Sequence, residues 1–211
     1  MNCSFINNSL FCIDSGDFND GGAISCNYSS NVTINKCVFI NNSIHCREKC
    51  FINIGGALLL VYCNVEIEYC SFIENSLYVD EMNSFHFGGA LNLAETCTII
   101  NYCFFCDNDA LQGGDIFFLY QFSTIQIKNC IFERKNDNKN LTRSLIAFWG
   151  YVGPLNFTFK NNKVKVLDSK EMFIFAFDIG KKNPNCDFDN NCISPYNKTL
   201  FSDPLIDQIE D

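Results

Sequence analysis

Acidic side chains are the residues of this chain whose spacing best fits catalytic chemistry. Glu66 and Glu68 alternate along an apolar stretch, and Asp107, Asp109 and Asp115 crowd around one short connection. Enzymes that cleave glycosidic bonds place a pair of such carboxylates together on one exposed face, as acid and as base or nucleophile. We expect all five side chains to be solvated surface. Glycan cleavage near residues 107–115 is the alternative.

Cysteine and histidine form the second set of chemically capable residues. Cys46 and Cys50 stand beside His45, and two residues separate Cys103 from Cys106, a spacing known from zinc sites. No second pair stands at the distance of a zinc finger, so we favour disulfides or free thiols and expect no metal and no cofactor. The sequence also shows no nucleophilic triad and no glycine-rich phosphate loop, so we predict no catalytic residue.

Of the 14 cysteines, eleven fall into two groups by their position within a repeat. One group recurs in the same slot of successive units and is expected to form a buried, stacked row of small apolar side chains: Cys3, Cys37, Cys70, Cys103 and Cys130. The other group stands in or near connecting segments and supplies the better disulfide candidates, with the pairing left open: Cys12, Cys46, Cys50, Cys106, Cys186 and Cys192.

Two sequence motifs alternate along the chain. One reads Cys-x-Phe-x-x-Asn and begins at positions 3, 37, 70 and 103; the other reads Gly-Gly-Ala-aliphatic and begins at 21, 55 and 88, then at 113 with Asp in place of Ala. Each such unit buries its apolar face only against its neighbours, which is typical of solenoids. The motif residues to which we assign structural roles are Gly21, Gly22, Phe39, Asn42, Gly55, Gly56, Phe72, Asn75, Gly88, Gly89, Phe105, Asn108, Gly113 and Gly114.

Within each unit, apolar and polar residues alternate with period two, as in Val65 and Ile67 against Glu66 and Glu68, which indicates strands. We expect three short strands and three corners in each unit of about 25 to 34 residues. The sequence therefore predicts an all-β fold, a single-stranded parallel β-helix of about six to seven coils and roughly 30 Å in length.

Each motif residue has an expected mechanical role. Stacked phenylalanines fill the bore, and stacked asparagine amides hydrogen-bond from coil to coil. The glycine pairs permit a corner with an unusual φ and a close approach of the next coil. Asparagine at the other corner adopts the left-handed conformation at low cost.

The length of the units varies at one corner. Residues 43–54 and 76–87 are long connections, whereas 109–112 is short, so we expect the long loops, with His45 and His86, to share one edge of the rod. The repeats are clearest over residues 3–132. We place one β-helix domain at 1–192 and an irregular tail or partial cap at 193–211.

Composition limits the classes of partner. The 211 residues are 47% hydrophobic and 18% charged, as in folded proteins, and the formal net charge of −9 argues against binding nucleic acid. No apolar run approaches the roughly 20 residues that span a bilayer, so we expect membrane association only through regions outside this chain. The chain opens in mid-repeat, as expected of a piece of a longer protein.

Asparagine-linked glycosylation is the one modification that the sequence indicates. Eight Asn-x-Ser/Thr triplets are present, and the composition predicts about three by chance. This excess is consistent with a secretory route. The triplets begin at Asn2, Asn7, Asn27, Asn31, Asn41, Asn140, Asn156 and Asn197.

The alternation of Gly-Gly-Ala-aliphatic with Phe-x-x-Asn resembles the repeats of the chlamydial polymorphic outer membrane proteins and of related cysteine-rich protist surface proteins. The similarity covers about residues 3–132, with weaker extensions at 159–162 and 188–191. It implies a right-handed parallel β-helix displayed outside the cell, with roles in adhesion. Asp115 and the loss of the glycine pair after Gly114 depart from the pattern.

We therefore expect a non-enzymatic protein of the cell surface or extracellular space. Its loop edge would contact a host-cell or matrix protein, a glycan or sibling molecules. The alternative is a carbohydrate-active β-helix, either a polysaccharide lyase or a glycoside hydrolase, although the Gly-His-Gly of polygalacturonases is absent from the sequence.

Overall fold

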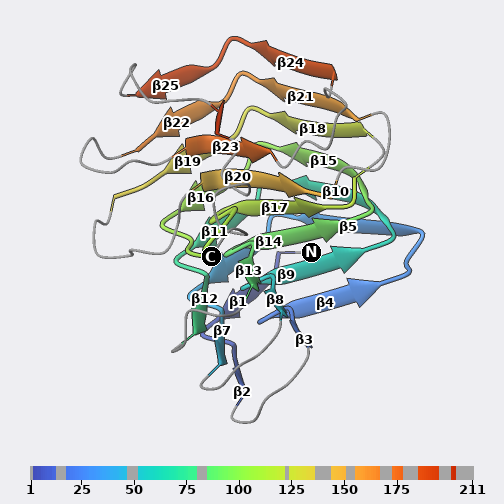
Figure 1. Ribbon diagram of the computed structural model, residues 1–211, viewed down its shortest axis with the longest axis vertical. Coiled ribbons are helices and arrows are strands. Elements are labelled where there is room, and N and C mark those ends of the chain that lie inside the picture. Colours follow the sequence, from blue (N-terminus) through green and yellow to red (C-terminus); the bar gives the residue numbers. More distant parts are fainter. Residues whose placement is uncertain are drawn as a thin grey trace, which may run out of the picture.

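The computed structural model is a β-solenoid of parallel strands (Figure 1). It describes residues 2–12, 18–46, 52–79, 85–121, 124–135, 144–150, 155–166, 173–177, 185–194 and 201–202. Across these ranges the chain forms strands, turns and bends but no helix, and paired strands run parallel from one repeat to the next. The prediction of an all-β parallel solenoid is confirmed.

Three long sheets run along the solenoid. Sheet A contains the Cys-x-Phe strands β1 (Ser4–Ile6), β6 (Val38–Ile40), β11 (Ser71–Ile73), β16 (Phe104–Cys106), β19 (Ile131–Glu133), β22 (Lys163–Lys165) and β25 (Cys192–Ser194). Sheet D, which follows the glycine corner, contains β4 (Ile24–Asn27), β9 (Leu58–Val61), β14 (Leu91–Ala94), β17 (Ile116–Leu119), β20 (Ser144–Trp149), β23 (Phe173–Phe177) and β26 (Phe201–Ser202). Sheet E contains β5 (Asn31–Asn35), β10 (Asn64–Glu68), β15 (Cys97–Asn101), β18 (Thr124–Lys128), β21 (Asn156–Lys160) and β24 (Asn185–Asp189).

The number of turns depends on which feature is counted. Sheets A and D each stack seven strands, and sheet E stacks six. Only four successive turns contain the Gly-Gly corner, so the regular part of the solenoid has about four turns. The expected six to seven coils match the strand counts of the long sheets but exceed this number of regular turns.

Two short sheets lie where the sequence predicted long loops. Sheet B contains β2 (Ser9–Cys12), β7 (Ser43–Cys46) and β12 (Ser76–Val79), and sheet C contains β3 (Phe18–Asp20), β8 (Ile52–Ile54) and β13 (Phe85–Phe87). The first three turns thus have five strands each, and the expectation of three per unit is wrong for them. Figure 1 shows these strands projecting at the blue and teal end of the solenoid.

Equal spacing explains the two extra strands. From the motif asparagine to the first glycine of the next corner there are 13 positions in each of these turns, from 8 to 21, 42 to 55 and 75 to 88, so the backbones stay in register. The fourth connection, from Asn108 to Gly113, is too short for strands. It retains only single bridges, Ser76 to Asp109 and Phe87 to Gln112.

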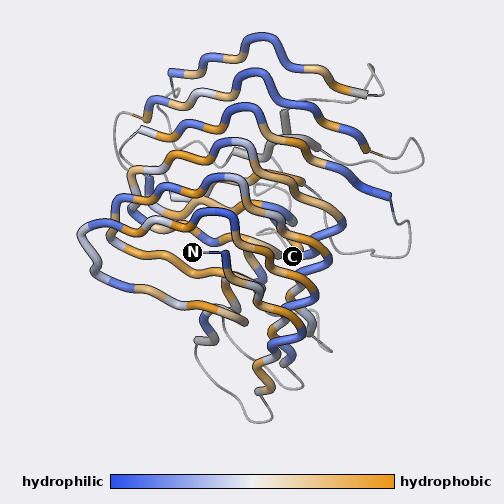
Figure 2. Tube along the Cα trace, turned by 180° about the vertical axis from the view of Figure 1, so that it is seen from behind, coloured by the Kyte–Doolittle hydropathy of each residue, from blue (hydrophilic) through white to orange (hydrophobic). Residues whose placement is uncertain are grey.

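Stacked phenylalanines fill the bore, as predicted. The rings of Phe39, Phe72, Phe105 and Phe132 are fully buried, and neighbouring centroids are 4.9, 5.0 and 4.9 Å apart. Offset ring contacts of this kind stabilise beyond the burial of area alone. Hydrophobic and hydrophilic residues alternate along the strands and recur from turn to turn (Figure 2).

Asparagine amides form the predicted ladder between turns. Asn42 Nδ2 donates to Asn75 Oδ1 and Asn75 Nδ2 donates to Asn108 Oδ1, both at 2.9 Å. Each buried amide also donates to a backbone carbonyl of the preceding turn, as Asn75 Nδ2 does to Phe39 O at 3.0 Å.

The prediction that the asparagine at this corner adopts the left-handed conformation is wrong by one residue. The left-handed residue precedes the ladder position, as at Asn41 (φ 52°), Glu74 (φ 55°) and Asp107 (φ 51°), because the ladder residue must point inward.

The glycine pair has the two roles that the sequence suggested. The first glycine has a positive φ, +74° at Gly55 and +75° at Gly88. At the second position there is no space for a side chain, because a Cβ on Gly56 would overlap the carbonyl oxygen of Gly89 in the next turn. Later turns lack the pair, and β20 and β23 continue sheet D without it.

Burial is lower in the first turn. Phe5 and Ile24 are half-buried, whereas their counterparts Phe39 and Leu58 are fully buried. In the expected tail, β25 ends at Ser194, and β26 pairs with β23. The remaining residues of 193–211 lie outside the described ranges.

Candidate functional site

The three aspartates at the short connection are buried, which corrects the expectation that they are solvated. Asp107, Asp109 and Asp115 are 5%, 2% and 1% exposed. The short connection holds them against the wall of the solenoid, since Asp109 N donates to Asn75 O at 2.8 Å and Asp107 N donates to Glu133 O at 3.1 Å. The candidate acids therefore lie beneath the surface.

Asp115 occupies the alanine slot of the glycine phrase. The corresponding Ala57 and Ala90 are fully buried, and Asp115 turns the same way, where its Oδ1 accepts a 2.9 Å hydrogen bond from Asn108 Nδ2. Burial raises the pKa of Asp115 from 3.8 to about 6, and the positive charge of Arg134 opposes this rise. Arg134 is itself only 4% exposed, so a buried cation lies near the three carboxylates.

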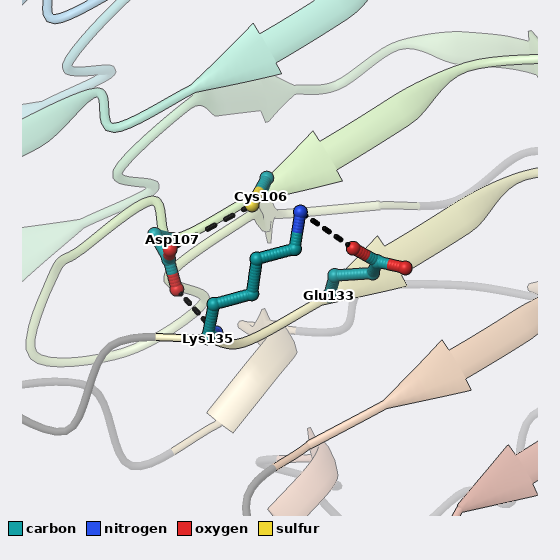
Figure 3. A network of polar contacts seen from close by, with 4 residues as sticks. All are labelled: Cys106, Asp107, Glu133 and Lys135. Atoms are coloured by element: carbon teal, nitrogen blue, oxygen red, sulfur yellow. Dashed lines mark hydrogen bonds and ion pairs between the residues drawn. The ribbon is translucent and has the colours of Figure 1, made fainter.

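Asp107 links the short connection to Lys135, just beyond the end of β19 (Figure 3). Its Oδ1 accepts a 2.7 Å hydrogen bond from Lys135 N, and its Oδ2 lies 3.6 Å from the donating Cys106 Sγ. Lys135 Nζ forms an ion pair of 2.9 Å with Glu133 Oε2. Burial, followed by the charge of Asp107, raises the pKa of Cys106 to about 11, so this thiol stays protonated at neutral pH and is a poor nucleophile.

The two groups of acids are not brought together. Glu66 is exposed and Glu68 half-buried on the outer face of β10, in sheet E, whereas the aspartates lie near the ends of β16 and the start of β17. Glu68 accepts long hydrogen bonds from Asn35 Nδ2 and Asn101 Nδ2, at 3.4 and 3.5 Å. Of the five candidate acids, Glu66 alone is exposed.

The two histidines share the edge formed by sheets B and C, as predicted, but in different surroundings. His45 lies between Phe11 and Tyr78 in a row on sheet B, with ring centroids 4.9 and 5.4 Å apart. His86, in β13, is 6% exposed, and burial lowers its pKa to about 4. His86 is therefore neutral at physiological pH.

Eleven cysteines in the described residues are free thiols. Four members of the expected row are buried, namely Cys37, Cys70, Cys103 and Cys130, but Cys3 is exposed because it lies in the first turn. Hydrogen bonding to Cys130 raises the pKa of Cys103 to about 12. No cluster of metal-ligating side chains occurs among the described residues.

The proposed disulfides receive no support where they are described. Cys106, Cys186 and Cys192 are free. Cys12 and Cys46 are register partners in β2 and β7, and their side chains, like the whole of Cys50, lie outside the described part of the structure.

Rows of exposed tyrosines at the corners of sheet E are a feature that the sequence reasoning missed. Tyr28 stacks on Tyr62 at 4.8 Å, and Tyr69 stacks on Tyr102 at 5.0 Å. All four have a positive φ, near 53–59°. The sequence could have indicated these rows, because each of the four tyrosines directly follows a strand.

The sequence comparisons add no further assignment. No protein-family model, curated protein or solved structure matches this chain. Within the described ranges, no helix has the length and apolar character needed to cross a bilayer.

Proposed function

We propose that this chain is a non-enzymatic, extracellular solenoid segment that binds host cells, matrix or sibling molecules through the edge formed by sheets B and C. The observation that carries this proposal is the aromatic row of Phe11, half-buried His45 and Tyr78, whose two outer rings are exposed. Phe11 is 68% exposed and Tyr78 is 48% exposed, although both rings are large and apolar. Contiguous exposed rings of this kind are characteristic of interaction surfaces.

The position of the variable segments supports the same edge. Residues 13–17, 47–51 and 80–84 connect sheet B to sheet C in successive turns, and their sequences share no motif. The flanking strands of sheets B and C keep their register from turn to turn although these connecting sequences differ. Such a separation of scaffold from variable connections suits an adhesive surface.

The extracellular location rests on the repeat resemblance and on the asparagine triplets. In the described residues, all the triplet asparagines are exposed: Asn2, Asn7, Asn27, Asn31, Asn41 and Asn156. Asn140 and Asn197 lie outside the described ranges. Exposure of the acceptor side chain is required for glycosylation, so these six positions are compatible with a secretory route.

Surface staining tests the location, and binding of the purified chain tests the activity. Intact cells should stain with an antibody raised against the chain, and the purified chain should bind host cells or immobilised matrix in a saturable manner. Strictly intracellular protein that binds neither would overturn the proposal.

Glycan cleavage is weakened as an alternative because Asp107, Asp109 and Asp115 are buried. A cleaving enzyme would have to use Glu66 with an acid beyond the five candidates. Incubating the chain with acidic and neutral polysaccharides, with and without calcium, and measuring new reducing ends or unsaturated products distinguishes the two functions. Cleavage abolished by Glu66→Gln would replace the binding proposal with the enzymatic one.

A further inference from the structure

An extra residue interrupts the stacking at the corner between sheets D and E. In the second and third turns, one residue separates the left-handed position from sheet E: Cys63 between Tyr62 and Asn64, and Thr96 between Glu95 and Cys97. In the first turn, two residues, Ser29 and Ser30, stand between Tyr28 and Asn31. This insertion makes the first repeat 34 residues long, where the next two have 33.

A groove lies at this corner. A concavity of about 380 Å³ is lined by Ser29, Ser30, Tyr62 and Glu95, among others, and a second of about 280 Å³ opens beside it on the outer face of sheet E. Asn64 and Cys97 line both concavities. The two therefore form one groove from the corner onto the sheet, within the size range of ligand-binding sites.

The charged residues that line the groove are all acidic. Glu95 lines the corner concavity and Glu66 lines the one on the sheet, and no lysine, arginine or histidine lines either. The Tyr62 hydroxyl is hydrogen-bonded to the carboxylate of Glu95, and the Tyr62 ring stacks on the exposed Tyr28. Two carboxylates beside accessible aromatic rings favour a cation, through ion pairing and cation–π attraction.

The polar row between the carboxylates favours an extended peptide. Asn31, Asn64 and Cys97 are register partners in β5, β10 and β15, and Asn64 Nδ2 donates to Asn31 Oδ1 at 3.2 Å. Primary amides offer both donors and acceptors, the pair that a peptide main chain requires. A peptide lying across this row would place successive basic side chains near Glu66 and Glu95.

We propose that this groove binds a lysine-bearing extended segment of a protein partner. Glu66 and Glu95 pair with the ammonium groups, and Asn64 hydrogen-bonds the main chain. The groove is separate from the aromatic row on sheet B, so loss of peptide binding would leave the proposed interaction edge untouched.

Fluorescence polarisation with a labelled heptapeptide of alternating glycine and lysine tests the proposal. The peptide should bind saturably, and an otherwise identical glutamate peptide should not bind. Glu66→Gln and Glu95→Gln should each weaken binding by about three- to tenfold, as expected for losing one partly exposed ion pair. Glu74→Gln is the matched control, because it removes the same charge from an exposed corner on sheet A and should leave affinity unchanged.

Alkylation of Cys97 provides a second measurement that does not depend on a variant. This thiol is exposed and lines both concavities, whereas the exposed Cys3 and Cys192 lie elsewhere in the fold. Saturating lysine peptide should slow the reaction of Cys97 with a maleimide, read out by peptide mass spectrometry, and leave Cys3 and Cys192 unaffected.

Several outcomes would overturn the proposal. Equal weakening by Glu74→Gln would show attraction to net charge rather than binding in the groove. Competition by spermine or by an amino-sugar oligomer at lower concentration than unlabelled peptide would assign the groove to another ligand class. Unchanged alkylation of Cys97 at saturating peptide would place the bound peptide elsewhere, and absence of peptide binding would remove the proposal.

Discussion

The side-chain amide of Asn108 donates a 2.9 Å hydrogen bond to Oδ1 of Asp115, in the slot where earlier turns have alanine. The asparagine ladder through Asn42, Asn75 and Asn108 thus ends on a carboxylate. The substitution and the shortened connection occur in the same turn. The aspartate that resembled a catalytic acid is therefore part of the scaffold.

Replacing Asp115 by asparagine should change how stability depends on pH. The pKa of Asp115 is about 6 in the folded chain and 3.8 ordinarily, so the folded state binds the extra proton between these values. Its contribution is fully present below about pH 4 and is lost as the pH rises through about 6. Urea titrations from pH 4 to 7 should show that Asp115→Asn lacks this component. Arg134, Asp107 and Asp109 also act on this carboxyl and remain in the variant.

Asp189→Asn is the matched control for this prediction, because Asp189 is exposed at the end of β24. It should keep the pH dependence of the parent chain. If Asp115→Asn and Asp189→Asn have the same pH profile, the burial and the altered ionisation of Asp115 are wrong.

Asn75→Ala should be strongly destabilising. Asn75 Oδ1 accepts from the backbone and side-chain amides of Asn42 at 3.0 and 2.9 Å, and Asn75 Nδ2 donates to Phe39 O and Asn108 Oδ1. One buried group left without a partner costs about 1–3 kcal/mol, so we expect a loss of at least ~3 kcal/mol. Chemical denaturation measures it. Asn64→Ala, on the exposed face of β10, should cost less than about 0.5 kcal/mol, and equal losses would refute a buried ladder.

Gly56→Ala tests the close approach of successive turns. An added Cβ would overlap the carbonyl oxygen of Gly89 and press on the backbone of Ser76, and overpacking of this kind costs about 1–3 kcal/mol. The midpoint of thermal unfolding should be lower for Gly56→Ala than for the parent chain. It should be unchanged for Ser25→Ala, whose side chain is exposed. An unchanged midpoint for Gly56→Ala would mean that the corner has space the structure does not show.

Phe72→Ala tests the assignment of inward and outward faces. Phe72 is fully buried between Phe39 and Phe105, so its truncation should cost about 3–5 kcal/mol. Glu66→Ala, on the exposed side of β10, should change the free energy of unfolding by less than about 0.5 kcal/mol. A larger loss for Glu66→Ala would reverse the two faces.

The sequence predicted the parts of the fold that depend on strict repetition. Phe39, Phe72 and Phe105 recur at fixed spacing, and a residue at such a position can only stack on its counterpart in the next turn. The two roles of the glycine pair, a corner with an unusual φ and a close approach of the next turn, were predictable for the same reason. The spacing of the repeats thus determines which residue each side chain stacks on, and this stacking determines whether the side chain is buried.

The predictions that failed concern places where repetition is interrupted. Residue type alone predicts a surface position for Asp115, whereas its position in the repeat, which it shares with the buried Ala57 and Ala90, predicts burial. The strands of sheets B and C are three or four residues long, too short for a clear alternation, and only their equal spacing indicated them. The groove begins beside the extra residue at Ser29 and Ser30 and is lined by residues of three successive turns, so it could not be read from any single repeat.

Binding by matched surface variants tests the central claim most directly. Phe11→Ser with Tyr78→Ser removes the two exposed rings of the aromatic row on sheet B, whereas Tyr69→Ser with Tyr102→Ser removes a similarly exposed stacked pair from a corner of sheet E. With both double variants shown to be folded by circular dichroism, saturation binding to host cells or matrix should be lost for the first and retained for the second. Full binding by the Phe11 and Tyr78 variant would contradict the proposed interaction edge.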